Sequence, residues 1–449
     1  MSEALPDYFL ADLPREAALT PEMVTEACRN LKSNRTKFLA ERNTVSITQL
    51  LSALAEDWLV PDFPFRQQAL EASPEITGFG PATLARGLDA LFSQLNREQF
   101  ESLLDQELGH PLRLDQLIGS QVRAIARGPE LLAHVTAGNI PAPAIMNIVL
   151  GILIRSAQFV KCASGTSYLV RLFAHSIYQR DPKLGACIEI AEWPGGRTDL
   201  EQCLFDAADC VTATGSDETL AAIRARLPPH VRFVPYGHRV SFAYIAHEML
   251  TRHSARDLAG KAVLDVIAWN QLGCLSPHVI YVEIGGNISP EQFAAMLGEE
   301  LARAEASEPR GDILIQDAGQ ISSRRGFYQV RAAASNETRL WQSENSTAWT
   351  VVYEQDAQFQ LSCLNRFVFV KPVNDLTDAL QSAASVKGKV STVALAAPRQ
   401  KAEQLALELA RWGAARICPV GRMQNPPLTW RHDGRPAVGD LVMWTDWES

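Results

Sequence analysis

Residues 269–278 read Trp269-Asn270-Gln271-Leu272-Gly273-Cys274-Leu275-Ser276-Pro277-His278. They place one cysteine between a predicted helix over 259–269 and a predicted strand over 279–282. The glycine before the cysteine lets the backbone approach a neighbouring group closely, and the proline after it prevents the turn from continuing as helix. Backbone N–H groups in such a loop can lower a thiol's pKa, and the thiolate is the reactive form. The stretch suits an exposed nucleophile, although a buried cysteine that packs as a small apolar side chain also fits it.

Short strands alternate with helices upstream of this loop. The predicted strands cover 131–135, 158–161, 187–191, 210–213 and 231–236, and the predicted helices cover 142–155, 168–179 and 217–226. This alternation predicts an α/β fold with a parallel, doubly wound sheet, whose ligands bind beyond the carboxyl ends of the strands. Five residues stand at those ends: Asn139, Lys161, Ser164, Gly215 and Ser216.

Two further regions flank this unit. Residues 20–110 carry apolar side chains at helical spacing and predict a helical lead. A second α/β unit is expected over about 241–393, with strands at 279–282, 350–353 and 367–370. The tail after Ile417 is loop-rich and ends in an apolar strand at 441–444, which needs a partner strand.

Bulk properties limit the function classes. A chain of 449 residues predicts two or three domains, and the net charge of −9 argues against a nucleic-acid-binding surface. Residues 1–10 lack a basic segment followed by an apolar run, so no export signal is expected. The longest apolar stretch, 140–154, contains two prolines and is too short to span a membrane. Eight cysteines without metal-ligand spacing predict a reduced, cytoplasmic protein with no metal site.

Five short segments occur in a characteristic order. They are HVTAGNIP at 134–141, FVKCAS at 159–164, ATGS at 213–216, YGHRVS at 236–241 and GCLSPH at 273–278. Together they resemble the aldehyde dehydrogenase superfamily, and more narrowly the LuxC-type acyl-CoA reductases, which supply long-chain aldehyde to bacterial luciferase. The resemblance covers about residues 120–440, and although each motif is weak alone, the ordered set is specific.

The resemblance implies a role for each matching residue. Cys274 corresponds to the nucleophile, and Asn139 to the asparagine that forms an oxyanion hole with the backbone N–H of the cysteine. Lys161 matches the lysine that contacts the adenosine ribose of the cofactor. Gly215 and Ser216 match the start of the pyrophosphate loop, at a helix N-terminus as phosphate binding requires.

The resemblance also implies a domain plan. Residues 1–240 would form the helical lead and the NADP-binding domain, and residues 241–430 the catalytic domain that carries the thiol. Residues 112–127 would join residues 435–449 in an oligomerisation segment, which predicts a homodimer or a homotetramer.

Three departures from the family pattern sharpen the expectation. Pro235 aligns with the glutamate that activates water in hydrolytic aldehyde dehydrogenases, and a thioester reductase does not need that base. Ser164 stands where NAD-preferring members hold a glutamate on the ribose 2′-OH, which permits NADPH. Leu220 replaces a later glycine of the pyrophosphate loop, so the dinucleotide would bind more loosely or in a different pose.

These observations predict NADPH-dependent reduction of an acyl thioester to the aldehyde through an acyl group on Cys274. The acyl donor would be acyl-CoA, an acyl carrier or an acyl-transferring partner enzyme. The alternatives are an oxidising aldehyde dehydrogenase and a non-catalytic scaffold that only carries an acyl group. His238 and His278 are weaker acid–base candidates, Cys162 fits a packed thiol at a strand end, and Arg239 could pair with an acidic group or with a phosphate.

Overall fold

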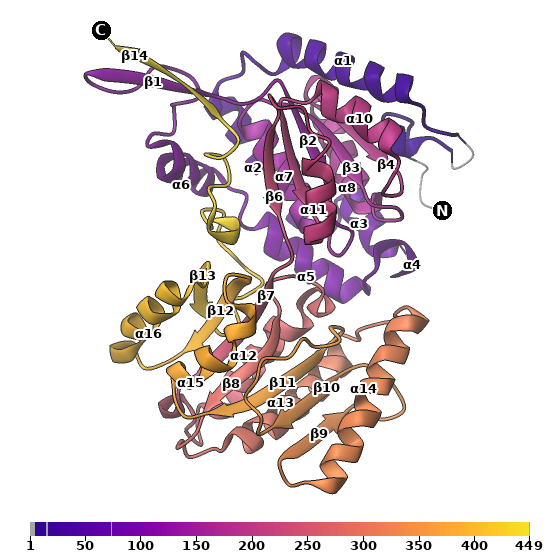
Figure 1. Cartoon of the computed structure of the whole chain (residues 1–449). Coiled ribbons are helices and arrows are strands. Elements are labelled where there is room, and N and C mark those ends of the chain that lie inside the picture. Colours follow the sequence, from indigo (N-terminus) through magenta and orange to yellow (C-terminus); the bar gives the residue numbers. More distant parts are fainter. Residues whose placement is uncertain (1–4, 15–16, 73, 449) are drawn as a thin grey trace.

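The computed structural model describes residues 5–14, 17–72 and 74–448. Residues 1–4, part of the stretch searched for an export signal, and Ser449, the end of the predicted oligomerisation segment, lie outside these ranges. Figure 1 shows two lobes, each built on one β-sheet, and a two-stranded arm that leaves the upper lobe. None of the helices within the described ranges is long and apolar enough to cross a membrane.

The first lobe contains a five-stranded parallel sheet of order β4-β3-β2-β5-β6. Its strands are β2 (Leu131–Val135), β3 (Ala157–Cys162), β4 (Ile188–Glu192), β5 (Cys210–Thr214) and β6 (Arg232–Tyr236). The crossover helices are α7 (Ala142–Leu153), α8 (Tyr168–Arg180), the short α9 (Pro182–Gly185), α10 (Thr198–Ala207) and α11 (Asp217–Arg224). Strands β2 and β3 are buried along their whole length because helices cover both faces of the sheet. The predicted doubly wound α/β architecture is therefore confirmed.

The helical lead belongs to this first lobe. Val24 and Leu31 of α1 pack on one face of the sheet, in the same apolar cluster as β2 and α10, and Trp58 of α2 packs with α7 and α8 on the other. The Trp58 indole also donates a hydrogen bond to Ser176 at 2.9 Å. The lead helices are α1 (Pro21–Phe38), α2 (Thr44–Leu59), α3 (Pro64–Glu71), α4 (Pro74–Thr77), α5 (Pro81–Phe92) and α6 (Arg97–Leu108), preceded by a 3-10 turn at Leu10–Asp12.

The second lobe contains a seven-stranded sheet of order β13-β12-β7-β8-β11-β10-β9, parallel except for the edge strand β9. Its strands are β7 (Val240–Ile245), β8 (Pro277–Glu283), β9 (Thr338–Gln342), β10 (Thr350–Glu354), β11 (Phe367–Val373), β12 (Val390–Ala396) and β13 (Arg416–Pro419). Its helices are α12 (Ala255–Ile267), α13 (Pro290–Ser307), α14 (Ile315–Ala334), α15 (Leu376–Ser382) and α16 (Arg399–Trp412). Three of these strands match predicted ones, and the sequence did not predict β7, β9, β12 or β13.

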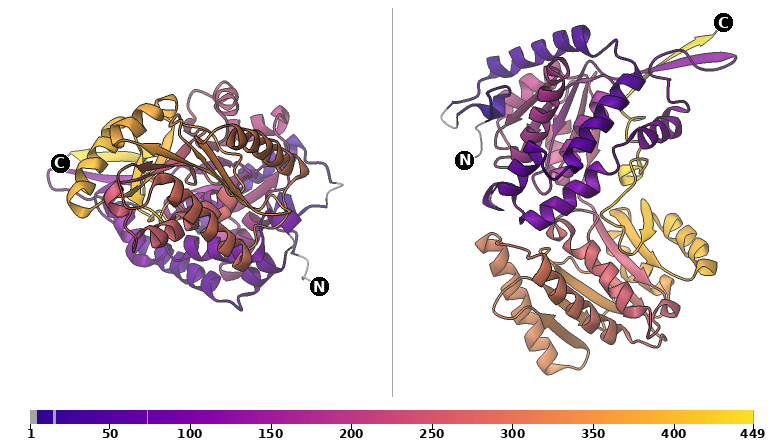
Figure 2. Two further views of the ribbon diagram at one scale, coloured as in Figure 1. Left: turned by 90° about the horizontal axis from the view of Figure 1, so that it is seen from below. Right: turned by 180° about the vertical axis from the view of Figure 1, so that it is seen from behind.

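The arm pairs β1 (Val122–Arg127) with β14 (Met443–Glu448) in antiparallel register. It projects away from both lobes in the rear view of Figure 2. Trp444 and Trp447 are each more than two-fifths exposed, and the Arg123 guanidinium lies 3.7 Å from the centre of a Trp447 ring. Leu441 and Val442 are buried, so the exposed strand begins at Met443, two residues later than predicted.

Candidate active site

The chain reaches Cys274 through an unusual backbone. After α12 ends at Ile267, Trp269, Asn270 and Gln271 all have positive φ angles, of 50°, 49° and 64°. Left-handed backbone costs an L-residue roughly 1–2 kcal/mol, so a run of three needs strong support from its surroundings. A second run, Leu364, Asn365 and Arg366, has φ angles of 59°, 55° and 66°. We call these the first and the second left-handed turn.

The two left-handed turns hold each other through buried side chains. The Gln271 amide donates to the carbonyls of Pro277 and Phe367, and accepts from the Phe367 N–H, each at 2.8 Å. The Asn270 amide oxygen accepts from the Arg366 guanidinium at 3.2 Å. Gln271 and Arg366 have no exposed surface, so these hydrogen bonds do not compete with water. They fix the start of the Cys274 loop to the start of β11.

Cys274 lines a cavity of about 180 Å³ between the two lobes. Helix α5 and the turn after it contribute Gly87, Ala90, Leu91 and Gln94, and α7 contributes Ala142, Pro143, Met146, Asn147 and Leu150. The tail contributes Gln424, Pro426, Pro427, Leu428, Trp430 and His432. The described lining residues include no carboxylate, lysine or arginine, and most are apolar. Such a cavity is suited to a hydrocarbon chain.

Packing against a neighbouring ring requires glycine at position 87. A methyl group added there would come within 2.2 Å of the Trp269 ring, in the first left-handed turn. Trp269 also packs edge-on against Phe79 at 5.0 Å between ring centres. The helical lead, for which the sequence predicted no site residue, therefore shapes the wall beside Cys274.

Cys274 is half-buried as a residue, and its thiol is poorly solvated. Burial raises the pKa of Cys274 to about 12, and the nearby carboxylate of Asp433 adds to the rise. Arg239 and the Ser391 hydroxyl act in the opposite direction on that pKa. The backbone carbonyl of Cys274 accepts a hydrogen bond from Ser241 at 2.7 Å, which fixes the loop against β7. The thiol thus carries its proton at neutral pH.

The tail between β13 and the arm is held at both ends. Asp265 of α12 accepts from the N–H groups of Gly421 and Met423 at 2.6 and 2.8 Å. Glu107 of α6 accepts from the three consecutive N–H groups of residues 437–439 at 2.7–3.0 Å. The tail therefore crosses from the second lobe to the first, and its middle part closes the cavity over Cys274.

Asn139 lies on the loop that follows β2. It is exposed and outside the lining of the cavity, whereas the next residue, Ile140, lines it. A methyl group added at Gly273 would touch the Ile140 side chain at 3.4 Å, so this loop passes beside the cysteine loop. The structure brings the backbone of the two predicted catalytic residues into one region, but it does not direct the Asn139 amide into the cavity.

The four predicted cofactor residues lie at the carboxyl ends of strands β3 and β5 of the first sheet, a region that we call the cofactor edge. Because β3, β2 and β5 are neighbours, the loops that contain Ser164, Gly215 and Ser216 meet there. Ser164 and Ser216 are exposed, and the Ser216 hydroxyl caps α11 by accepting from the Thr219 N–H at 3.3 Å. Lys161 is buried, which lowers its pKa against the opposing effect of Glu201. Two acidic residues in the first turn of α11 weaken the attraction of this helix N-terminus for phosphate.

A carboxylate lies beside the Ser164 turn even though position 164 has none. Glu192, at the end of β4, accepts from the N–H groups of Gly165 at 2.7 Å and Ser167 at 3.3 Å. Its negative charge opposes a 2′-phosphate at the same place. The sequence argument for NADPH considered Ser164 and the positive charge of Lys161, and did not include this neighbour.

The structure shows where the weaker thiol, histidine and arginine candidates lie. Cys162 has no exposed surface, and burial raises its pKa to about 12. His278 accepts from the Ser362 N–H at 3.1 Å, and burial lowers its pKa to about 4. His238 is exposed, and neither histidine lines the cavity. Arg239 pairs with the Asp433 carboxylate at 3.2 Å, which answers the question that the sequence left open.

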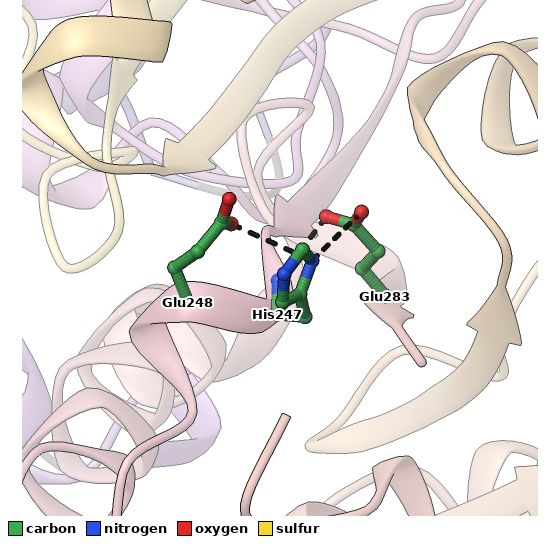
Figure 3. A group of neighbouring side chains, drawn as sticks. All are labelled: His247, Glu248 and Glu283. Carbon is green, nitrogen blue, oxygen red and sulfur yellow. Dashed lines mark hydrogen bonds and ion pairs between the residues drawn. The ribbon is translucent and has the colours of Figure 1, made fainter. Parts of the chain in front are cut away.

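Figure 3 shows a separate polar group at the far end of β8. His247 Nδ1 lies 3.0 Å from a Glu283 oxygen and 3.5 Å from a Glu248 oxygen. The Lys401 ammonium already pairs with Glu248. The group lies at the opposite end of β8 from Cys274.

Sequence reasoning missed the residues that surround the thiol from far along the chain. Ser391 on β12 and the turn His432–Gly434 lie more than 100 residues after Cys274. The Asp433-Gly434 pair is a recognisable turn signal, but a turn signal does not reveal where the turn docks. His432 lines the cavity with its ring stacked on Tyr236 at 4.5 Å.

Sequence comparison finds relatives over most of the chain. A sequence model of the family described as acyl-CoA reductase (LuxC) matches residues 39–444. The long-chain acyl-protein thioester reductase of Vibrio harveyi is 23% identical over 352 residues, covering 77% of this chain and 70% of that protein. The protein of the same name from Photobacterium phosphoreum is 20% identical over 418 residues, covering 90% and 82%.

Solved structures give the same fold at lower identity. A putative aldehyde dehydrogenase PutA from Anabaena variabilis has a TM-score of 0.71 at 15% identity, covering 96% of this chain and 93% of its own. An NAD-dependent benzaldehyde dehydrogenase from Corynebacterium glutamicum has a TM-score of 0.71 at 12% identity, covering 96% and 91%. The predicted aldehyde-dehydrogenase-like fold is confirmed.

Proposed function

The chain belongs to the acyl-CoA reductase (LuxC) family, and from this premise we propose that it reduces an acyl thioester to the aldehyde through an acyl group held on Cys274, with NADPH as reductant. The observation that carries the proposal is the placement of Cys274 in a mostly apolar cavity with no carboxylate among its described lining residues. A hydrocarbon chain fits this lining, and its described residues include no carboxylate base that could activate water.

Acylation is the first step. The Cys274 sulfur attacks the thioester carbonyl, the carrier thiol leaves, and the acyl group remains on the sulfur. We assign the developing oxyanion to the Asn139 amide and the backbone N–H of Cys274, where each donor typically contributes about 3–4 kcal/mol. Because Asn139 is exposed in the free protein, its loop would have to close toward Ile140 when the acyl donor binds.

Reduction is the second step. A bound nicotinamide cofactor supplies the hydride that the acyl carbon needs. The protein's own part is to hold that carbon on Cys274 and to keep water away with the apolar walls from α5, α7 and the tail. After hydride arrives, the Cys274 thiolate leaves, the aldehyde is released and the thiol regains a proton.

The absence of a hydrolytic base favours reduction over oxidation. Pro235 aligns with the water-activating glutamate of hydrolytic aldehyde dehydrogenases. It lies on β6, next to the cavity-lining Tyr236. His134 lines the cavity, but burial lowers its pKa to about 4, and both its nitrogens lie within hydrogen-bond distance of Thr212 and Gln158. An oxidising aldehyde dehydrogenase would need a group that activates water, and this histidine is already engaged.

The decisive experiment measures the loss of NADPH absorbance when purified protein is mixed with acyl-CoA thioesters of short to long chain length. We expect aldehyde to appear in step with cofactor oxidation, and slow or no reaction with aldehyde and NADP in the other direction. Faster oxidation of aldehyde than reduction of thioester would favour the oxidising alternative. Acylation of Cys274 without any cofactor turnover would favour the scaffold.

Assembly is a second part of the proposal. The arm presents Val122, Met443, Trp444 and Trp447 to solvent, an apolar surface that a partner subunit would cover. We expect a homodimer or homotetramer, and light scattering at micromolar concentration should give an even multiple of 49.4 kDa. Replacing Trp447 by Glu should lower the mass toward that of one chain, and a wild-type mass of 49.4 kDa would contradict the proposal.

A further inference from the structure

The proposed acylation needs a base that accepts the proton of the Cys274 thiol. Burial raises the pKa of Cys274 to about 12, so the thiol must lose its proton during attack rather than before it. The cavity lining supplies no carboxylate for this purpose among its described residues. A carboxylate base would therefore have to reach the sulfur from behind the cavity wall.

Ser391 occupies that place. It has no exposed surface, and its hydroxyl acts to lower the pKa of the Cys274 thiol. The next residue, Thr392, donates its N–H to Ser241 at 3.1 Å, and the Ser241 hydroxyl donates to the Cys274 carbonyl at 2.7 Å, so this part of β12 lies beside the cysteine loop. Strand β12 changes register against β7 between Val390 and Thr392, so Ser391 is the residue at the irregularity. Bulges occur often beside active sites, where they redirect a side chain that a regular strand would point elsewhere.

Behind Ser391 lies a buried carboxylate. The Ser391 hydroxyl donates to Asp433 Oδ1 at 3.2 Å, and Asp433 Oδ2 pairs with Arg239 at 3.2 Å. The Asp433 side chain is 3% exposed, and its φ of 53° puts it in the left-handed region. A strained residue persists only where its surroundings fix it, and strain of this kind clusters at functional sites.

Resting on the proposed function, we propose that Asp433 accepts the Cys274 proton through the hydroxyl of Ser391, so that a carboxylate from the tail serves as the base for thiol activation. In this relay Ser391 takes the proton from the sulfur, and Asp433, held by Arg239, takes it in turn from Ser391. The base that the sequence appeared to lack at position 235 is thus supplied from the opposite side of the thiol.

The proton balance closes over the acylation step. The sulfur–carbon bond forms while the thiol proton moves to Ser391 Oγ and the Ser391 proton moves to Asp433 Oδ1. The bond from the carbonyl carbon to the carrier's sulfur then breaks. The proton returns along the same path to the leaving thiolate, and nothing is oxidised or reduced in this half of the reaction.

His432 is the competing base. It lines the cavity, but its ring stacks on Tyr236 at 4.5 Å and packs at a tilt against Trp430 at 4.8 Å. Burial lowers its pKa, while the charges of Asp433 and Arg239 act on it in opposite directions. The hydrogen-bonded path from Ser391 ends on Asp433, which is why we favour the carboxylate.

The test measures single-turnover acylation of the full chain by dodecanoyl-CoA without NADPH, from pH 6 to pH 9.5. Mass spectrometry of quenched samples gives the fraction of the Cys274 peptide that carries the acyl group. General base catalysis typically contributes 10²–10⁴-fold, so Ser391→Ala and Asp433→Asn should each slow acylation by about 10²-fold at pH 7. The deficit should shrink by about tenfold per pH unit, because without the base only the equilibrium thiolate attacks.

Ser156→Ala is the matched control, because this serine is equally buried, its hydroxyl has no hydrogen-bond partner, and it lies in the other lobe. It should acylate at the wild-type rate.

Three outcomes would contradict the proposal or the function on which it rests. A loss of acylation rate by the same factor at every pH in both test variants would mean that Ser391 and Asp433 have only a packing role, which overturns the proposal. A steep pH profile in His432→Asn but not in Ser391→Ala would assign the base to the histidine instead. If the wild type itself is never acylated, the proposed function fails, and that result is distinct from a failure of the relay.

Discussion

The cofactor edge of the first sheet and the cysteine loop of the second lobe are built in opposite ways. At the cofactor edge, Lys161 lies near the end of β3, Ser164, Gly215 and Ser216 follow their strands within two residues, and Ser216 caps the helix that comes directly after it. At the cysteine loop, two left-handed turns 95 positions apart hold each other through buried hydrogen bonds. The first region can be read from local sequence, whereas the second depends on contacts between distant residues.

The difference teaches where strain is tolerated. An exposed edge that binds a cofactor needs only adjacent strand ends and open loops. A buried thiol needs a loop with a defined shape, and here that shape includes three consecutive left-handed residues. Such a loop persists because the surrounding hydrogen bonds fix it. We therefore expect substitutions at the cysteine loop to have larger effects than substitutions at the cofactor edge.

The largest effect should come from the thiol itself. Cys274→Ser should lower thioester reduction by roughly 10⁴-fold or more, because a hydroxyl is a poor nucleophile and losses on this scale follow removal of catalytic groups. Mass spectrometry after incubation with acyl-CoA alone should find one adduct, on the Cys274 peptide of the wild type. An adduct on Cys162 would contradict the assignment, since that thiol is fully buried.

The second-largest effect should come from removing a side chain whose hydrogen bonds support the left-handed turns. Gln271→Ala leaves two carbonyls and one N–H without their partner in the protein interior. Each such group costs about 1–3 kcal/mol, so the free energy of unfolding should fall by at least about 3 kcal/mol. Denaturant titration followed by fluorescence measures this change.

Leu364→Gly is the matched variant in the second left-handed turn. Glycine relieves a left-handed backbone that costs a leucine roughly 1–2 kcal/mol, but it loses about 0.5–1 kcal/mol through the entropy of the unfolded chain. The free energy of unfolding should therefore change by no more than about 1 kcal/mol. A loss as large as that of Gln271→Ala would show that side-chain packing, and not the hydrogen bonds, holds the turns.

The smallest effect should be at the cofactor edge. We expect NADPH to be preferred over NADH by about tenfold or less, since a single screened charge contributes a few kcal/mol at most. Ser164→Glu should reverse the order of kcat/KM, because it places a carboxylate where Ser164 is exposed. Glu192→Gln should raise the preference for NADPH, because it removes the negative charge beside that turn.

Steady-state kinetics with both cofactors would measure these ratios for the wild type and the two variants. A wild type that prefers NADH, with Ser164→Glu leaving the ratio unchanged, would show that the 2′-position lies elsewhere. The assignment of Cys274 does not depend on this outcome.

The sequence by itself determined the parts of this protein that follow from local pattern. Alternating apolar strands and helices predicted the first sheet to within a few residues, because buried parallel strands leave short, continuous apolar runs. The order of five motifs indicated the family, and the glycine–cysteine loop indicated the candidate nucleophile. The roles of Asn139 and of the cofactor residues stay predictions.

Only the tertiary structure decided what surrounds the thiol. Gly87 of the helical lead, Ser391 at an irregular strand and Asp433 of the tail meet near Cys274 from three distant parts of the chain. No periodicity or spacing encodes such a meeting, because it depends on how two lobes and a returning tail pack together. The same holds for the Glu192 carboxylate, which lies beside Ser164 because β3 and β4 are neighbours in the sheet.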